Sequence, residues 1–425
     1  MKKIKMMMAA ALGVLVSCGS VKSGEEAIAA SRESKVVVAY VTSWSEVMPD
    51  PQYMTHINYA FGHVNESFNG VKIDNEERLR QIVDLRKQKP ELKVLLSIGG
   101  WGSGRFSEMA ANDEYRRAFA ADCDRVVKEF ALDGIDIDWE YPTSSMANIS
   151  SSPDDTENFT LLMQDIRAAI GNEKELTLAT VASARYIDFK AILPSVDFVN
   201  IMAYDMASAP KHHSALYPSG HSGDITSDGA VTAHLKAGVP PSKLVMGMPF
   251  YGRGGDGYPS FQDYNKVGNT DTQYTEKWDE VAQVPYLADK NDTLVFGFEN
   301  PRSLAIKCQY ILDKDLLGGM YWDYSGDNEQ GDLRRTVAEN LLGKPHKAKV
   351  LVLTERGGQH GGFTDAGLRW LAAEGVKGNF SITEINNARN ITEAYLSQFS
   401  LVIQLDFPPY TWPKEAEDAF VKYIE

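Results

Sequence analysis

The sequence contains little cysteine, with three residues in a chain of 425. Cys18 lies at the end of an N-terminal targeting segment, which leaves Cys123 and Cys308 for the body of the protein. Two cysteines in a chain of this size do not indicate a disulfide framework. Stability must come from hydrophobic cores instead. The 43% hydrophobic content is enough for one large domain and part of another.

Basic residues are also in the minority. The 43 Lys and Arg residues are outnumbered by 58 Asp and Glu residues, which gives a formal net charge of −15. Binding to a phosphate backbone depends on Lys and Arg. This charge balance therefore argues against nucleic acid as a partner, and it is compatible with a neutral glycan.

The N-terminal apolar run, residues 6–16, is too short for a transmembrane helix. Three lysines precede it, so residues 1–18 are predicted to be an export signal. Its end, Leu-Val-Ser-Cys, resembles the bacterial lipobox. This resemblance implies a lipidated Cys18, a polar tether at 19–35, and an exported lipoprotein anchored to the membrane at the cell surface or in the periplasm. The alternative is an ordinary signal peptide with an incidental Cys18.

Strand-like and helix-like segments alternate from residue 36 onward. The predicted strands are 36–40, 56–61, 93–97, 134–140, 175–181, 198–202, 244–249 and 318–324. Amphipathic stretches such as 114–132 and 156–170 lie between most of them. Eight strands with intervening helices predict a (β/α)8 TIM barrel over 36–343. Functional residues are then expected just after the strands.

The most informative stretch is residues 133–142, Asp-Gly-Ile-Asp-Ile-Asp-Trp-Glu-Tyr-Pro. Side chains of a strand alternate between its faces, so Asp136, Asp138 and Glu140 are predicted on one face and the apolar residues on the other. Repulsion and burial raise carboxyl pKa values, so such a row titrates as a coupled set. We interpret Glu140 as a general acid. The alternatives are a solvated strand face or a cation site.

Aromatic and glycine residues gather at the ends of the other predicted strands. Flat aromatic side chains suit the apolar faces of sugar rings. Each aromatic taken singly is more often a core residue, but their recurrence at so many strand ends indicates a glycan pocket. The candidate substrate-binding residues are Tyr40, Phe61, Gly100, Trp101, Met202, Asp205, Tyr251, Arg253 and Trp322.

Asp133, Asp136, Asp138 and Glu140 match the DxxDxDxE signature of glycoside hydrolase family 18, and Trp-Glu-Tyr-Pro resembles its chitinase branch. The resemblance covers residues 36–342. It implies a retaining chitinase that uses the substrate's own acetamido group, with chitin or other N-acetylglucosamine glycans as partner and neither a metal nor another cofactor. Alternatives are an endo-β-N-acetylglucosaminidase acting on N-glycans or peptidoglycan, and a non-catalytic surface glycan-binding protein.

The resemblance also implies a role for each catalytic candidate. Glu140 protonates the leaving oxygen, and Asp138 orients the acetamido group with support from Asp136. Tyr204 donates a hydrogen bond to the acetamido oxygen, and Trp322 forms the floor under the reacting sugar. Asp133, on the other face of the strand, is interpreted as structural.

Two further segments of the barrel carry predictions. Residues 254–299 occupy the place of an α+β subdomain in many family members, and their shortness predicts a reduced insertion and an open cleft. His212 and His213 begin a long Gly- and Ser-rich loop. Adjacent histidines can bind metal, but no acid or cysteine stands at ligand spacing, so we predict a surface loop.

Residues 346–425 repeat a strand–helix order three times, which predicts a partial flavodoxin-like α/β segment. The segment loosely resembles the start of ThuA-like domains, named for trehalose utilisation. A further strand would be expected after Glu425, where the sequence ends. His360 follows a predicted strand, but we interpret the segment as a structural appendage without a catalytic role.

Overall fold

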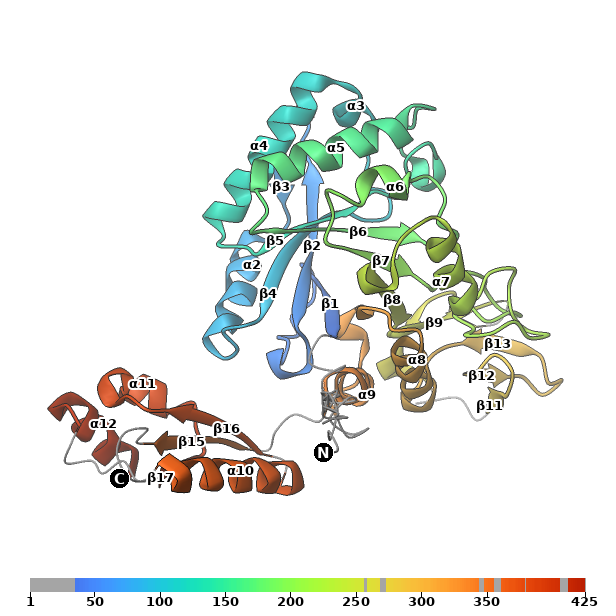
Figure 1. Ribbon diagram of the computed structural model, residues 1–425. Coiled ribbons are helices and arrows are strands. Elements are labelled where there is room, and N and C mark those ends of the chain that lie inside the picture. Colours follow the sequence, from blue (N-terminus) through green and yellow to red (C-terminus); the bar gives the residue numbers. More distant parts are fainter. Residues whose placement is uncertain are drawn as a thin grey trace, which may run out of the picture.

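Eight parallel strands close into a barrel in the computed structural model (Figure 1). The structure describes residues 35–255, 258–267, 273–343, 348–354, 361–378, 380–405 and 412–424. The strands are β1 (Val36–Thr42), β2 (His56–Val64), β4 (Lys93–Gly99), β5 (Gly134–Asp138), β6 (Glu175–Val181), β7 (Phe198–Met202), β8 (Leu244–Pro249) and β14 (Gly318–Trp322). Pairing of β1 with β2 closes the barrel, and β3 (Val71–Ile73) adds an antiparallel edge to β2.

Residues of β1 alternate between two cores. Val37, Ala39 and Val41 pack outward against the helices, whereas Val38 and Tyr40 pack inside the barrel. This follows from the period of two along a strand. The predicted (β/α)8 barrel is therefore confirmed.

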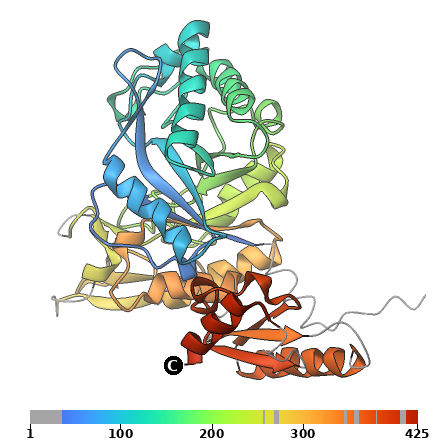
Figure 2. The same cartoon turned by 90° about the vertical axis from the view of Figure 1, so that its left-hand side faces the viewer.

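Helices surround the barrel strands on the outside (Figures 1 and 2). The longest of these, α4, begins after Asn112, whose side chain accepts hydrogen bonds from the backbone at Glu114 and Tyr115. Its buried residues recur every three or four positions, which presents one apolar stripe to the barrel. The helices are α2 (Glu76–Val83), α3 (Phe106–Ala111), α4 (Asp113–Glu129), α5 (Asp155–Ile170), α6 (Phe189–Ile192), α7 (Ser227–Lys236), α8 (Pro301–Asp313) and α9 (Asp332–Leu341).

The insertion predicted at 254–299 is a small antiparallel sheet with the strand order β10-β9-β13-β12-β11. Its first strand begins at Tyr251, directly after barrel strand β8, so this sheet is joined to the rim of the barrel. The strands are β9 (Tyr251–Gly254), β10 (Gln262–Asp263), β11 (Thr275–Asp279), β12 (Val284–Ala288) and β13 (Leu294–Gly297).

The C-terminal segment forms a parallel sheet of its own, in the order β16-β15-β17 (orange and red in Figures 1 and 2). Val350 and Val352 pack with α10 on one face of this sheet. Leu351 and Leu353 pack with α11 and α12 on the other. The predicted partial α/β segment is thus confirmed as a fold. Its elements are β15 (Ala348–Thr354), α10 (Gly361–Gly378), β16 (Phe380–Ile385), α11 (Glu393–Leu396), β17 (Leu401–Leu405) and α12 (Lys414–Ile424).

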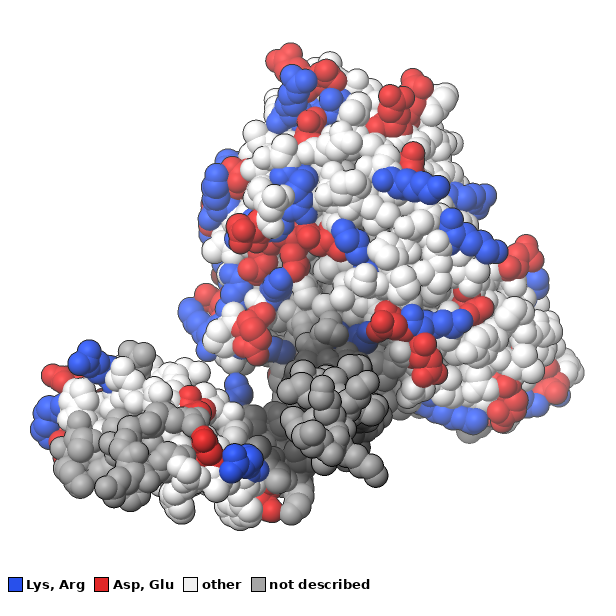
Figure 3. Space-filling model, viewed as in Figure 1, with Lys and Arg blue, Asp and Glu red and all other residues white. Residues whose placement is uncertain are grey.

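Lys and Arg side chains lie beside Asp and Glu side chains over much of the face in Figure 3. On α4, for example, Arg125 pairs with Asp122 and Glu129, and Lys128 pairs with Asp124. Such exposed pairs contribute little to stability. Among the described residues, no helix is both long enough and apolar enough to cross a membrane.

Candidate active site

Strand β5 places its carboxylates as the alternation predicts. Ile135, Ile137 and Trp139 pack in the outer core against the helices, which turns Asp136 and Asp138 toward the barrel interior. Glu140 follows two residues beyond the end of β5, at the carboxyl end of the barrel. Three acids are thereby brought to one face, and solvent reaches no more than 9% of any of them.

Asp136 lies below the cleft and accepts four hydrogen bonds. Tyr40 and Ser97 donate to Oδ2 at 2.7 and 2.8 Å. Thr177 and Asn200 donate to Oδ1 at 2.6 and 3.3 Å. Burial raises the pKa of Asp136, and these donors oppose that shift. The donors come from four different strands, so they hold the carboxylate rigidly beneath Asp138.

Asp138 and Glu140 form the titrating pair of the site. Burial, then the charges of Glu140 and Asp136, raise the pKa of Asp138 well above its usual range. Burial raises the pKa of Glu140 to about 7, with a further contribution from Asp205. The pair therefore holds a proton at neutral pH, as a general acid requires. Oδ1 of Asp138 is buried and has no hydrogen-bond partner among the described residues.

Tyr204 follows β7 and lies beside this pair. Burial, then the nearby charges of Asp138 and Glu140, raise the pKa of its phenol well above the usual range. The phenol stays protonated as a result and is available as a donor. Its ring meets Tyr251 at 6.1 Å between centroids. Its hydroxyl donates to Sδ of Met320 at 3.7 Å, which is a weak acceptor.

Aromatic rings form the floor of the site. The Trp322 ring, at the end of β14, stacks on Phe61 with centroids 5.6 Å apart and planes inclined by 20°. Tyr40 and Trp44 contact the same indole at 5.6 and 6.5 Å. Such a floor presents flat apolar faces to a ligand.

The insertion sheet supplies one wall. Tyr251 of β9 stacks on Phe261 at 4.7 Å, and the guanidinium of Arg253 lies 5.3 Å from each of these rings. Arg253 also holds Asp205 with two hydrogen bonds, of which Nε to Oδ1 measures 2.7 Å. Burial raises the pKa of Asp205, but the two hydrogen bonds from Arg253 and the nearby imidazole of His213 outweigh it and keep the pKa below its usual range.

These side chains line one cleft of about 760 Å³. Of the predicted site residues, eleven line it: Tyr40, Phe61, Trp101, Asp138, Glu140, Met202, Tyr204, Asp205, Tyr251, Arg253 and Trp322. Asp136 lies beneath, in its supporting position. Gly100, predicted to bind substrate, does not line the cleft.

Gly100 instead makes room for a neighbouring ring. Its φ is +93°, and a Cβ there would come within 2.7 Å of the Phe61 ring. A side chain at this position would displace Phe61 from its stack on Trp322. The glycine therefore acts through packing.

The prediction missed several cleft residues, among them Trp44, Tyr141, Tyr186 and Phe261. Tyr141 stacks on Tyr186 at 5.5 Å and meets Trp101 at 6.4 Å, which forms a second aromatic wall. Tyr141 directly follows Glu140, and Trp44 lies two residues after β1. Both positions lie just after barrel strands, where functional residues are expected, so both residues could have been predicted. Tyr186 and Phe261 lie in longer loops, where distance along the sequence from a strand does not indicate whether a residue reaches the cleft.

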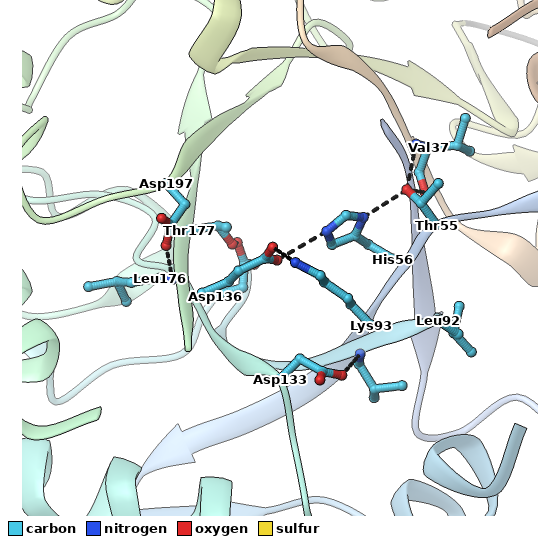
Figure 4. A network of polar contacts seen from close by, with 12 residues as sticks. Val37, Thr55, His56, Leu92, Lys93, Asp133, Asp136, Leu176, Thr177 and Asp197 are labelled. Atoms are coloured by element: carbon cyan, nitrogen blue, oxygen red, sulfur yellow. Dashed lines mark hydrogen bonds and ion pairs between the residues drawn. The ribbon is translucent and has the colours of Figure 1, made fainter. Parts of the chain in front are cut away.

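Asp133 does not line the cleft. Figure 4 shows it next to the backbone of the neighbouring strand. Its Oδ2 accepts from the backbone N–H of Val94 at 2.7 Å and from Arg86. Nearby, His56 and Lys93 both pair with Glu175, at the start of β6. These contacts join barrel strands and support the structural interpretation of Asp133.

His212 and His213 correct a prediction. The loop was expected to leave them at the surface, but their side chains are 1% and 0% exposed. The loop folds back onto the insertion sheet, where His212 Nε2 lies 3.2 Å from Asp279 Oδ2. Burial lowers the pKa of His212 to about 4. Gly and Ser content predicted an irregular segment, but it carries no information about what that segment packs against.

A parallel barrel that carries a carboxyl of raised pKa, a second acid and stacked aromatics at the carboxyl ends of its strands is the arrangement expected of a glycoside hydrolase. Residues 36–327 match the sequence model described as "Glycosyl hydrolases family 18". The chain belongs to this family, as the resemblance of the β5 motif predicted. Across the described residues, no group of three or more His, Cys, Asp and Glu side chains is placed to hold a metal ion.

Named relatives and solved structures agree with this family. The chain is 31% identical to chitotriosidase-1 of Mus musculus over 350 residues, which cover 69% of this chain and 74% of the relative. It is 29% identical to chitinase A1 of Niallia circulans over 413 residues, covering 72% of this chain and 58% of that longer protein. A family 18 N-acetylglucosaminidase from Paenibacillus barengoltzii superposes with a TM-score of 0.67 at 32% identity, over 72% of this chain and 99% of the other.

Proposed function

We propose that this glycoside hydrolase is a chitinase, which cleaves β-1,4-linked N-acetylglucosamine polymers with retention of configuration. The observation that carries the proposal is Glu140, a carboxyl with a pKa of about 7 that faces the cleft beside Asp138 and Tyr204. Its raised pKa lets Glu140 keep a proton near neutral pH, as an acid catalyst of glycoside cleavage must. Chitinase A1 of Niallia circulans and chitotriosidase-1 of Mus musculus, to which the chain is similar, support the same substrate class.

Each residue of the site has its own role in the proposed reaction. Glu140 donates its proton to the leaving glycosidic oxygen. The carbonyl oxygen of the sugar's own acetamido group attacks the anomeric carbon, which makes family 18 an exception to the use of two protein carboxylates. Asp138 orients the acetamido N–H, and Tyr204 donates to the carbonyl oxygen. Glu140, now ionised, removes a proton from water, which opens the cyclic intermediate and restores the original configuration.

Asp136 and the aromatic floor prepare these groups. Four donors satisfy the carboxylate of Asp136. Oδ1 of Asp138 has no hydrogen-bond partner among the described residues, and we propose that it accepts a hydrogen bond from the substrate. The Trp322 and Phe61 stack supports the sugar from below. Holding the reacting groups in place before substrate arrives reduces the entropy lost on the way to the transition state.

The experiment compares N-acetylglucosamine oligomers with glucosamine oligomers that lack every acetyl group, and identifies products by mass. We expect cleavage of the acetylated oligomers alone, because no described protein group replaces the acetamido oxygen. Equal cleavage of both would overturn the mechanism and make Asp138 a candidate protein nucleophile.

The same products separate the alternatives. Cleavage within an N-glycan core of a glycoprotein, without attack on chitin oligomers, would identify an endo-β-N-acetylglucosaminidase. Release of N-acetylglucosamine as the only product would identify an N-acetylglucosaminidase, the class to which the similar protein from Paenibacillus barengoltzii is assigned. Binding without any product would identify a glycan-binding protein.

We also propose that Cys18 carries a lipid and anchors the protein to a bacterial membrane. Cys18 lies outside the described residues. The proposal is supported by the lysines, the apolar run and the lipobox-like Leu-Val-Ser-Cys.

A further inference from the structure

His213 is a buried histidine that the proposed reaction does not use. Its side chain is 0% exposed, and its Nδ1 lies 3.5 Å from Oδ1 of Asp205. The ring rests on Tyr251, with centroids 5.4 Å apart. Neither ring nitrogen has a well-aligned hydrogen-bond partner among the described residues. Burying an imidazole costs free energy. The imidazole of His213 faces the carboxylate of Asp205 in the cleft.

Asp205 is held from two sides. Arg253 reaches it from β9 of the insertion sheet and binds both carboxylate oxygens. His213 approaches Oδ1 from the loop that follows β7. Asp205 itself has a φ of +54°, an uncommon conformation for a residue other than glycine. Its carboxylate direction is therefore set by neighbours as well as by its own backbone.

The loop that carries His213 is itself fixed. The preceding residue, His212, contacts Asp279 of β11 at 3.2 Å, and Ser219 donates to the same carboxylate at 2.8 Å. The following residue, Ser214, donates to Glu299 at 2.6 Å and accepts from Lys307 through its carbonyl oxygen. His213 thus stands between two anchored neighbours, and its ring has little freedom to move.

We propose that His213 is a positioning residue for the reaction: it holds the Asp205 carboxylate in the orientation that keeps its charge directed at Glu140. This inference rests on the proposed function. The groups that face His213 are Asp205, Tyr251 and, through Asp205, Arg253. The Glu299–Lys307 ion pair lies behind it, beyond Ser214.

The physical consequence concerns the acid. Burial is the main cause of the raised pKa of Glu140, and the negative charge of Asp205 raises this pKa further. If Asp205 turns away from Glu140, that contribution falls and Glu140 loses its proton at lower pH. Positioning by His213 should therefore appear in the pH profile of turnover, which a purely structural histidine would not alter.

The test measures kcat and KM for N-acetylglucosamine oligomers, and the pH profile of kcat/KM, in His213→Leu and His213→Asn. Leu fills the site without a donor. Asn carries an amide nitrogen on Cγ, in the place of Nδ1. We expect kcat of His213→Leu to fall by about tenfold, because a polar contact with a buried charged group is lost, with a smaller change in KM. Its alkaline limb should move to lower pH, and His213→Asn should restore most of both properties.

His234→Ala is the matched control. His234 is equally buried, on α7, and its Nδ1 contacts the carbonyl oxygen of Ala230 at 2.8 Å, away from the cleft. Its replacement should lower the melting temperature without moving the pH profile. A folded His213→Leu protein with the parent's kcat and pH profile would overturn the proposal, as would His213→Asn behaving like His213→Leu. If the parent itself cleaves none of these oligomers, the proposed function fails instead.

Discussion

The phenol of Tyr40, at the end of β1, donates a hydrogen bond of 2.7 Å to Oδ2 of Asp136 on β5. Burial, then the charges of Asp136 and Asp138, raise the pKa of this phenol well above its usual range. Tyr40 therefore remains protonated at neutral pH and can donate to Asp136. One aromatic side chain thus lines the sugar cleft and also fixes the carboxylate beneath the catalytic pair.

Replacing Glu140 by Gln tests the acid. The amide keeps the shape and reach of the carboxyl but cannot supply the proton, so kcat should fall by about a hundredfold or more. The affinity for N-acetylglucosamine oligomers, measured by calorimetry, should change little. Glu173→Gln, at an exposed loop residue before β6, is the matched control and should retain parent activity. Turnover of Glu140→Gln within a few-fold of the parent would show that another group is the acid.

The pKa of Glu140 predicts the alkaline limb of activity. Because the acid form is the active one, kcat/KM should decline as the pH rises through about 7. The measurement is a pH–rate profile with a soluble oligomer at constant ionic strength. A profile that stays flat to pH 9 would contradict the assignment.

The same shift affects stability. A raised pKa means that the folded protein binds more protons than the unfolded chain between the ordinary glutamate pKa and about 7. Stability contributed by Glu140 is therefore present at low pH and lost as the pH rises through this window. Glu140→Gln removes the effect. Its melting temperature should exceed that of the parent above pH 7, and the difference should vanish near pH 4. Equal differences at both pH values would contradict the prediction.

Tyr204→Phe tests stabilisation of the attacking oxygen. The ring and its packing on Tyr251 remain, while one donor to an oxygen that carries charge near the transition state is lost. We expect kcat to fall by about ten- to a hundredfold with KM changed much less. A raised KM with unchanged kcat would show that the phenol serves ground-state binding instead.

Removing residues 346–425 tests the independence of the barrel. The cores of the C-terminal segment consist of residues from Val350 onward, and none of them belongs to the barrel core. The cleft is also lined by barrel and insertion residues. The shortened protein should keep the parent's kcat/KM on soluble oligomers. Failure to obtain soluble protein would show that the barrel needs the segment to fold.

Cys18→Ala tests the anchor. Without a thiol the residue cannot be lipidated, and one membrane anchor is lost. In a bacterial host, the variant should move from the membrane fraction to the soluble fraction. Ser17→Ala, which keeps a small residue before Cys18, is the control and should stay with the membrane. A Cys18→Ala protein that remains in the membrane fraction would point to a different anchor.

The sequence by itself determined the barrel and the direction of the β5 carboxylates. The carboxylate direction follows from the period of two along a strand, which is a local property: once Ile135 and Ile137 pack outward, Asp136 and Asp138 must point inward. The barrel and the C-terminal α/β order follow from the alternation of strand-like and helix-like segments, which is also visible in the sequence. Aromatic residues directly at strand ends, such as Trp322, could also be placed in the cleft.

Only the tertiary structure decided the contacts that tune these groups. Tyr40 and Asp136 lie 96 residues apart in the sequence, and the hydrogen bond between them exists because closure of the barrel brings β1 and β5 across its interior. The packing of Gly100 against the Phe61 ring could not be predicted, because that ring comes from another strand. His213 was placed at the surface because loop composition predicts irregular backbone and is silent about burial. Packing between segments that are distant in the sequence decides those features, and no local pattern records it.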